Sequence, residues 1–168
     1  VGSVTYSTNF DQVEYPISEG GRWRKTPNPW TFVRTEGGTA YGTNGVANGY
    51  DDSYALLSGF GPNQAVEVVV QRNPGSPQTS HEALIMLRSS DDTNNIRGYE
   101  CLFNYYGGYD LVRWSGPYGA WKSLSLTKSG WHGRELVTGD RLKCKMIGNT
   151  ITSYINEVLM AEAVDSTF

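Results

Sequence analysis

Alternation of apolar and polar residues over short segments is the dominant pattern along this chain. Gln64–Gln71 places alternate valines on one side, and Asp140–Ile147 alternates Leu142, Cys144 and Met146 with charged residues. A period of two is the period of a β-strand with one buried face. Both segments therefore predict strands.

The stretch His81–Trp121 predicts three or four strands in immediate succession. Its apolar segments are joined by the short turns Asp-Asp-Thr-Asn-Asn, Gly-Gly and Ser-Gly-Pro-Tyr-Gly. Strands separated by so few residues must pair antiparallel, because a parallel crossover needs about a dozen residues or more. We therefore expect an antiparallel meander at the centre of the chain.

The remaining segments complete an all-β pattern. Glycine and proline in Asp11–Pro29, Thr43–Asp52 and Asn73–Ser80 predict loops, and no segment predicts a stable helix. Further strands are predicted at Ser3–Phe10 (an edge strand), Trp30–Arg34, Thr39–Gly42, Ser53–Leu57, Trp121–Leu126 and Thr150–Val164, the last interrupted near Asn156-Glu157. So many short strands favour a single domain over residues 1–168, a two-sheet antiparallel β-sandwich of jelly-roll type.

Composition and charge narrow the classes of partner. Hydrophobic residues make up 38% and aromatic residues 12% of the chain, enough to exclude a disordered protein. The net charge of −3 and the pI near 5.4 argue against nucleic acid, which would require a basic surface. No apolar run is long enough to span a membrane. We therefore expect neither a nucleic-acid nor a membrane partner.

The order of these elements resembles the concanavalin A-like lectin and glucanase jelly roll, in particular its laminin-G-like branch. The segments that carry the resemblance are Thr8–Asp11, Trp23, Trp30–Val33, Gly37-Gly38, Gln64–Val70, Ala83–Arg88, Gly98–Glu100, Asp140–Cys144, Asn149–Asn156 and Val164–Phe168. The resemblance covers nearly the whole chain but consists of a strand pattern with a few marker residues. It implies a fold more than a function, because this fold hosts lectins, glycosidases, lyases and adhesion modules.

The end of the sequence departs from that pattern. After Asp165–Phe168 such domains usually continue through a Gly-rich turn into a closing strand, and this sequence stops at Phe168. The resemblance therefore predicts either a truncated piece of such a domain or a domain without its closing C-terminal strand, whose open edge would be a site for pairing with another chain. We expect a protected edge, or an edge completed by another protein or by a second copy.

The two cysteines, Cys101 and Cys144, leave two interpretations open. One is a disulfide between the sheets, formed in an oxidising compartment. The other, slightly favoured, is a pair of small buried hydrophobic residues. Neither cysteine belongs to a Cys-x-x-Cys or Cys/His pattern, so a zinc or redox site is not expected.

Catalytic patterns are weak in this sequence. Glucanases of the resembled fold carry Glu-x-Asp-x-x-Glu on one strand, and no such run occurs here. Glu157 and Glu162 are five residues apart, which places them on opposite faces of a strand, whereas retaining hydrolysis needs two carboxyls about 5 Å apart. His81 is next to Glu82, but adjacent strand residues point to opposite faces, so the two are not expected to form a catalytic pair. His132 is best interpreted as a solvated loop residue, and Asp51-Asp52 and Asp91-Asp92 as turn residues. No catalytic residue is predicted.

No cofactor is required by any motif. The one metal that the sequence suggests is a structural Ca²⁺ held by loop oxygens, for which Asp11 and Asp165 are the candidates.

The meander carries the candidate binding surface. Sugar sites combine aromatic planes, which cover the apolar faces of the rings, with planar polar groups that bind the hydroxyls. If Cys101 and Phe103 face the core, alternate residues of the meander face outward. The candidate ligand-binding residues are Arg88, Asn104, Tyr106, Tyr109, Arg113, Tyr118 and Trp121.

These observations favour a non-catalytic, lectin-like carbohydrate-binding module that is extracellular or surface-displayed, with a glycan or polysaccharide as its partner. A structural or adhesion module, such as a virion decoration protein that binds protein through its aromatic face, is the second hypothesis. A polysaccharide hydrolase or lyase is the third.

Overall fold

The computed structural model describes residues 3–43, 52–72, 81–125, 130–131 and 134–168. Strands and turns make up these residues, without a helix, which confirms the all-β prediction. No helix in these ranges is long and apolar enough to cross a membrane. The chain divides into two compact units, Val1–Phe60 with Ser90–Ile96, and Gly61–Ser89 with Arg97–Phe168. The single domain over residues 1–168 stays a prediction.

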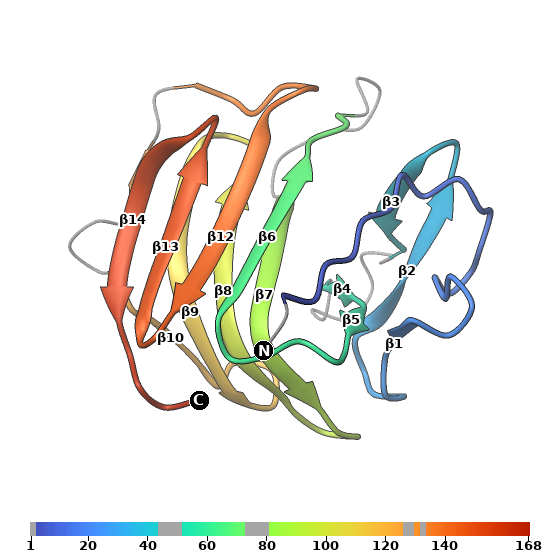
Figure 1. Cartoon of the computed structure of the whole chain (residues 1–168), viewed down its shortest axis with the longest axis horizontal. Coiled ribbons are helices and arrows are strands. Elements are labelled where there is room, and N and C mark those ends of the chain that lie inside the picture. Colours follow the sequence, from blue (N-terminus) through green and yellow to red (C-terminus); the bar gives the residue numbers. More distant parts are fainter. Residues whose placement is uncertain (1–2, 44–51, 73–80, 126–129, 132–133) are drawn as a thin grey trace. The chain divides into compact units, whose positions relative to one another are not determined.

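The second unit is a sandwich of two sheets (Figure 1). One sheet has the order β10-β9-β8-β7, with β11 also pairing with β9, and the other has the order β14-β13-β12-β6. The strands of the first sheet are β7 (Glu82–Asp91), β8 (Ile96–Asn104), β9 (Gly108–Gly116), β10 (Trp121–Ser123) and β11 (Gly130–Trp131). Those of the second are β6 (Gln64–Val69), β12 (Arg141–Ile147), β13 (Thr150–Ile155) and β14 (Val158–Val164). The predicted meander and the interruption at Asn156-Glu157 are confirmed.

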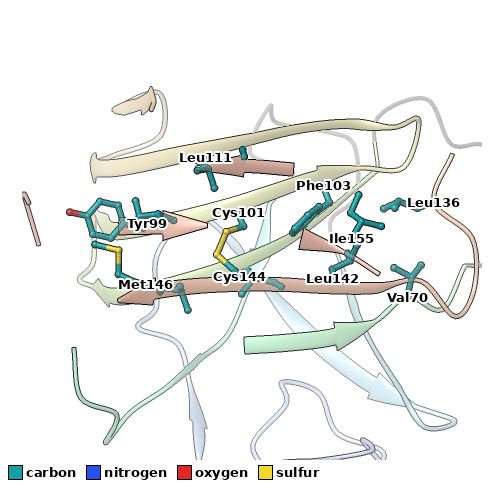
Figure 2. Close-up of a cluster of buried hydrophobic side chains, with 14 residues drawn as sticks. Val70, Tyr99, Cys101, Phe103, Leu111, Leu136, Leu142, Cys144, Met146 and Ile155 are labelled. Carbon is teal, nitrogen blue, oxygen red and sulfur yellow. A yellow bond between two sulfur atoms is a disulfide. The ribbon is translucent and has the colours of Figure 1, made fainter. Parts of the chain in front are cut away.

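The core lies between these two sheets (Figure 2). Leu142, Cys144 and Met146 are fully buried, as their alternation predicts, and they meet Cys101 and Phe103 of β8. Cys101 and Cys144 form a disulfide that joins β8 to β12. The interpretation of the cysteines as two free hydrophobic residues is therefore wrong. The two cysteines are 43 residues apart in the sequence, and no local pattern indicates that the fold brings their side chains together between the sheets.

The first unit consists of short strands and long irregular segments. Here β2 (Thr31–Glu36) and β3 (Thr39–Gly42), both predicted as strands, form a hairpin, and β4 (Ser53–Tyr54) runs parallel to β2. In addition, β1 (Trp23–Arg24) pairs antiparallel with β5 (Leu56–Leu57). The segment predicted as one strand at Ser53–Leu57 is therefore divided between two different pairings.

The predicted edge strand at Ser3–Phe10 is wrong. None of the residues 3–10 belongs to a strand. Instead the side chains of this segment pack on an aromatic anchor: the ring centroids of Tyr6 and Phe10 lie 5.9 and 6.4 Å from that of Trp23. The alternation of the segment was weak, and ring contacts replace the sheet pairing.

Candidate functional site

A pocket in the first unit is the candidate site. Its volume is about 250 Å³, slightly below the range of drug-sized small-molecule sites, roughly 300–1,000 Å³. Strand β1, the first half of β2 and the end of β4 supply half of the lining residues, and the segments beside them supply the rest. The lining residues are Pro16, Ile17, Ser18, Trp23, Arg24, Lys25, Phe32, Val33, Tyr54 and Ala55. A pocket of this size fits one sugar ring or a molecule of similar size.

Three aromatic side chains form the apolar part of the wall, and each is held in place by neighbours. The Trp23 indole Nε1 donates to Tyr6 Oη at 2.9 Å and to Glu19 Oε2 at 3.0 Å. Phe32 meets Tyr15 edge to face, and the buried Tyr54 ring meets Trp30 in the same way. Such contacts fix the ring planes before any ligand arrives.

Lys25 extends its half-buried ammonium over two of these rings. Its Nζ lies 4.7 Å from the ring centroid of Phe32 and 5.0 Å from that of Tyr54. The same Nζ donates to Asn28 Oδ1 at 2.6 Å and to the Thr26 carbonyl at 3.3 Å. Burial lowers the pKa of Lys25, and the charge of Asp91 acts in the opposite direction. The two rings stabilise a cation that water reaches only in part.

Asp91, at the end of β7, organises this side of the pocket. Its Oδ1 accepts from Arg24 at 2.7 Å, and its Oδ2 accepts from the Thr26 amide at 2.7 Å and from Tyr54 Oη at 2.9 Å. Burial raises the pKa of Asp91, but these hydrogen bonds outweigh burial and the pKa lies below its usual value. Asn28 also donates to Tyr54 Oη, at 2.5 Å. Asp91 thereby fixes Arg24 and Tyr54 in the wall.

The lining side chains include cations but no carboxylate. Among them are two cations, Arg24 and Lys25, and no Asp, Glu, His or Cys. Burial raises the pKa of the Tyr54 phenol well above neutrality, so the phenol stays protonated. The lining residues therefore contain no carboxylate or imidazole that could act as a general base.

Sequence reasoning missed this pocket. Asp91 was interpreted as a turn residue, and that interpretation holds only for its neighbour Asp92, whose Oδ1 accepts from the Asn94 and Asn95 amides. The available signal was the run Trp23-Arg24-Lys25, an aromatic residue beside two cations in a segment without regular periodicity.

The sequence-predicted binding residues lie in the second unit, and two of them are arginines with structural partners. Arg88 Nε donates to the Pro62 carbonyl at 2.7 Å, and Arg88 Nη1 donates to that of Phe168 at 2.8 Å. Its backbone amide donates to Gln64 Oε1 at 2.7 Å. Arg88 thus ties β7 to the entry of β6 and to the C-terminal segment.

Arg113 makes an ion pair on the same C-terminal segment. Its Nη1 lies 2.6 Å from Asp165 Oδ2 and donates to Thr167 Oγ1 at 2.7 Å. Asp165 Oδ1 accepts from Tyr99 Oη and from the Thr167 amide, both at 2.8 Å. Burial raises the pKa of Asp165, but these hydrogen bonds and the Arg113 charge outweigh burial and lower it.

The expected outward orientation of Tyr109 and Arg113 is wrong. Leu111 between them is fully buried in the core, and Tyr109 packs against the same cluster. Residues two apart in a strand share a face, so Leu111 fixes all three on the core side of β9. The outer face of β9 instead carries Val112 and Trp114, which are buried.

The other predicted residues lie at two turns of the meander. Asn104 Oδ1 accepts from the Tyr106 amide at 2.8 Å within the turn after β8. Tyr118 and Trp121, beside the turn before β10, are exposed at 45% and 52%. Trp121 pairs with Trp114 across β9 and β10. The structure does not bring the seven predicted residues to one pocket, and their role in binding stays a prediction.

The predicted metal ligands fall in different units, Asp11 in the first and Asp165 in the second. Both oxygens of Asp165 already accept hydrogen bonds, as described above. Within the described ranges no group of three or more His, Cys, Asp or Glu side chains is arranged to hold a metal ion. The Ca²⁺ site stays a prediction. His132 lies outside the described residues, and His81 is exposed next to β7.

Comparisons with known proteins support the fold. No protein-family model and no curated protein matches this chain. Among solved structures the chain is similar to the carbohydrate-binding module CBM66 from Bacillus subtilis, with a TM-score of 0.65 and 21% identity. The likeness covers 90% of this chain and 84% of that chain. At this identity it shows a shared β-sandwich fold, and the laminin-G-like branch stays a prediction.

Proposed function

We propose that this protein is a non-catalytic carbohydrate-binding module that holds a sugar residue in the pocket of the first unit. The observation that carries the proposal is the pocket itself: a cavity of about 250 Å³ whose walls combine the rings of Trp23, Phe32 and Tyr54 with fixed polar groups. Aromatic planes cover the apolar faces of sugar rings, and polar groups at the rim bind the hydroxyls.

Two further observations support this function. The solved structure that shares the fold is a carbohydrate-binding module. The lining side chains hold no carboxylate and no histidine, so they lack the acid–base pair that glycoside hydrolysis needs. The proposal therefore favours binding over bond cleavage.

The disulfide supports an extracellular or surface-displayed location. Cys101 and Cys144 form a bond between the sheets. Structural disulfides persist in oxidising compartments and are rare in the cytosol. We accordingly place the module outside the cell as part of the same proposal.

A glycan array with the full chain, followed by calorimetry on each hit, tests the function. Trp23→Ala should weaken binding about 30-fold, because a Trp at the centre of a binding site contributes on the order of 2 kcal/mol. Trp121→Ala is the matched control, since it removes an exposed Trp from the sequence-predicted face. Its affinity should stay within about twofold of that of the unmodified protein, which is the margin expected for a residue outside the site.

Three results would overturn parts of the proposal. An array without any bound glycan removes the function. Loss of binding in Trp121→Ala with retention in Trp23→Ala moves the site to the β9–β10 turn. Release of reducing ends from a bound polysaccharide contradicts the non-catalytic assignment. Circular dichroism of each variant shows that the comparison is made between folded proteins.

A further inference from the structure

We infer that the sugar residue held in the pocket is acidic, its ring carrying an anionic substituent that binds Lys25. This inference rests on the proposed function and names the ligand class of the same pocket. Three features of the pocket support it: the charge of Lys25, the N–H donor of Lys25 that the protein leaves unused, and the hydrogen-bonding character of the polar side chains in the wall.

The donors of Lys25 are not all used within the protein. An ammonium group has three N–H donors, and the two acceptors that Lys25 reaches are Asn28 Oδ1 and the Thr26 carbonyl. Among the described residues no carboxylate lies within ion-pair distance of its Nζ; the salt bridges of this unit join other cations. Lys25 lines the pocket, so its remaining donor and its charge are available to a ligand there.

Three carboxylates contact groups of this wall, and each of them is held by partners other than Lys25. Asp91 accepts from Arg24, the Thr26 amide and Tyr54. Glu14 Oε2 accepts from the Ser18 amide at 2.9 Å, and Glu19 Oε2 accepts from Trp23 Nε1 at 3.0 Å. Of the two lining cations, Arg24 is paired with Asp91, and Lys25 has an amide oxygen and a carbonyl as its acceptors, so a ligand anion would supply its counter-charge.

The hydrogen-bonding character of the wall points to the same ligand. Neutral sugars present hydroxyls that both donate and accept, so sites for them need acceptors as well as donors. The polar side chains that line this pocket are Ser18, Arg24, Lys25 and Tyr54. Two of these are pure donors, and Tyr54 Oη already donates to Asp91 and accepts from Asn28. A carboxylate or sulfate is a pure acceptor and matches such a wall.

The rings next to Lys25 strengthen the attraction between its ammonium group and an anionic ligand. Phe32 and Tyr54 keep water from one side of the ammonium, as the lowered pKa of Lys25 reflects. An ion pair is stronger where water is partly excluded than at an open surface. An acidic sugar stacked in the pocket would therefore gain more from Lys25 than from an exposed lysine.

Matched sugar pairs test the inference on the unmodified full chain. D-glucuronate is compared with D-glucose and D-galacturonate with D-galactose, each pair differing at C6, by chemical-shift titration at low salt. Galactose 6-sulfate separates sulfate from carboxylate as the source of the charge. At least one acidic sugar should bind about tenfold or more tightly than its neutral partner, the margin expected from a charge-assisted hydrogen bond.

Variants of Lys25 assign that preference to the pocket. Lys25→Gln should remove the preference for the acidic sugar, and Lys25→Arg should retain it, because Arg keeps the charge. The matched control is Lys145→Gln. Lys145 also lies over a ring, 5.9 Å from the centroid of Tyr154, but it belongs to β12 and not to the pocket.

The outcomes separate this inference from the proposed function. If neutral and acidic sugars bind equally, or if Lys25→Gln keeps the preference, the inference fails while carbohydrate binding stands. If no sugar of either kind binds here and the glycan array is also empty, the proposed function fails. If Lys145→Gln abolishes the preference and Lys25→Gln does not, the charge acts elsewhere and the inference is overturned.

Discussion

At the scale of single residues, Asp140 shows how a buried carboxylate is kept ionised in the second unit. It is 4% exposed, and its oxygens accept from Arg134 at 2.7 and 2.8 Å, from the Val137 amide at 2.8 Å and from Asn156 at 2.9 Å. The Arg134 hydrogen bonds, the largest cause, hold the pKa of Asp140 far below its usual value. The carboxylate joins the loop before β12 to the turn after β13.

This low pKa predicts a loss of stability in acid. The pKa of Asp140 is lower in the folded than in the unfolded protein, so its contribution is complete above the unfolded value of about 4. The contribution decreases as the pH falls from there toward the folded pKa. Asp140→Asn should lower the free energy of unfolding by about 1–3 kcal/mol at pH 7, because buried donors lose their acceptor.

Urea denaturation from pH 7 to pH 2 measures this effect. The difference between the unmodified protein and Asp140→Asn should shrink below pH 4. Asp110→Asn is the control, since Asp110 is half-buried and accepts from Ser123 and Ser125, with no arginine partner among the described residues. A difference that is constant with pH would show that Asp140 is not the titrating group.

At the scale of elements, β7 and β8 approach each other closely near Arg88 and Gly98. Arg88 adopts a left-handed backbone conformation with φ of 49°, and Gly98 has φ of 132°. A Cβ on Gly98 would lie 2.9 Å from the Leu87 carbonyl oxygen and 2.9 Å from Ser89 Cα. The hydrogen bonds that Arg88 makes to backbone carbonyls offset the cost of its conformation.

Gly98→Ala should therefore destabilise the protein strongly. We expect about 3 kcal/mol, which combines backbone strain of about 1–3 kcal/mol with an overpacking cost of similar size. Gly119→Ala separates the two terms, because Gly119 has φ of 86° but no atom within 4 Å of the added Cβ. It should cost about 1 kcal/mol. Equal losses in the two variants, measured by thermal unfolding, would contradict the close approach of the strands.

At the scale of the whole molecule, the two compact units carry different roles. The second unit holds the buried layer between its sheets and the disulfide that joins them. The first unit has few and short strands and carries the pocket. Stability and ligand affinity should therefore respond to different substitutions.

Removal of the disulfide tests this division. The loop that it closes spans 43 residues, so Cys101→Ala with Cys144→Ala should lower the free energy of unfolding by about 4 kcal/mol. The affinity for the best array glycan should stay unchanged at a temperature where the variant is folded, because both cysteines lie outside the unit that holds the pocket.

Chemical denaturation and calorimetry on the same variant give the two quantities. Reductant should destabilise the unmodified protein and leave the double variant unchanged. A parallel loss of glycan affinity in the folded variant would show that the pocket depends on the sandwich.

The sequence by itself determined the fold class and most of the strands. Period-two alternation in Gln64–Gln71 and Asp140–Ile147 shows which residues share a face, and short turns require antiparallel neighbours. These signals are local, and they predicted the core positions Leu142, Cys144 and Met146 correctly.

Only the tertiary structure decided which faces are buried and where the candidate site lies. Alternation assigns Tyr109 and Arg113 to the face of Leu111 but cannot say that this face is the core side. The pocket brings Lys25 to Phe32 and Tyr54 from irregular segments that have no period to interpret. Its wall forms through long-range contacts between loops, and the energy of such contacts depends on geometry that a residue pattern does not contain.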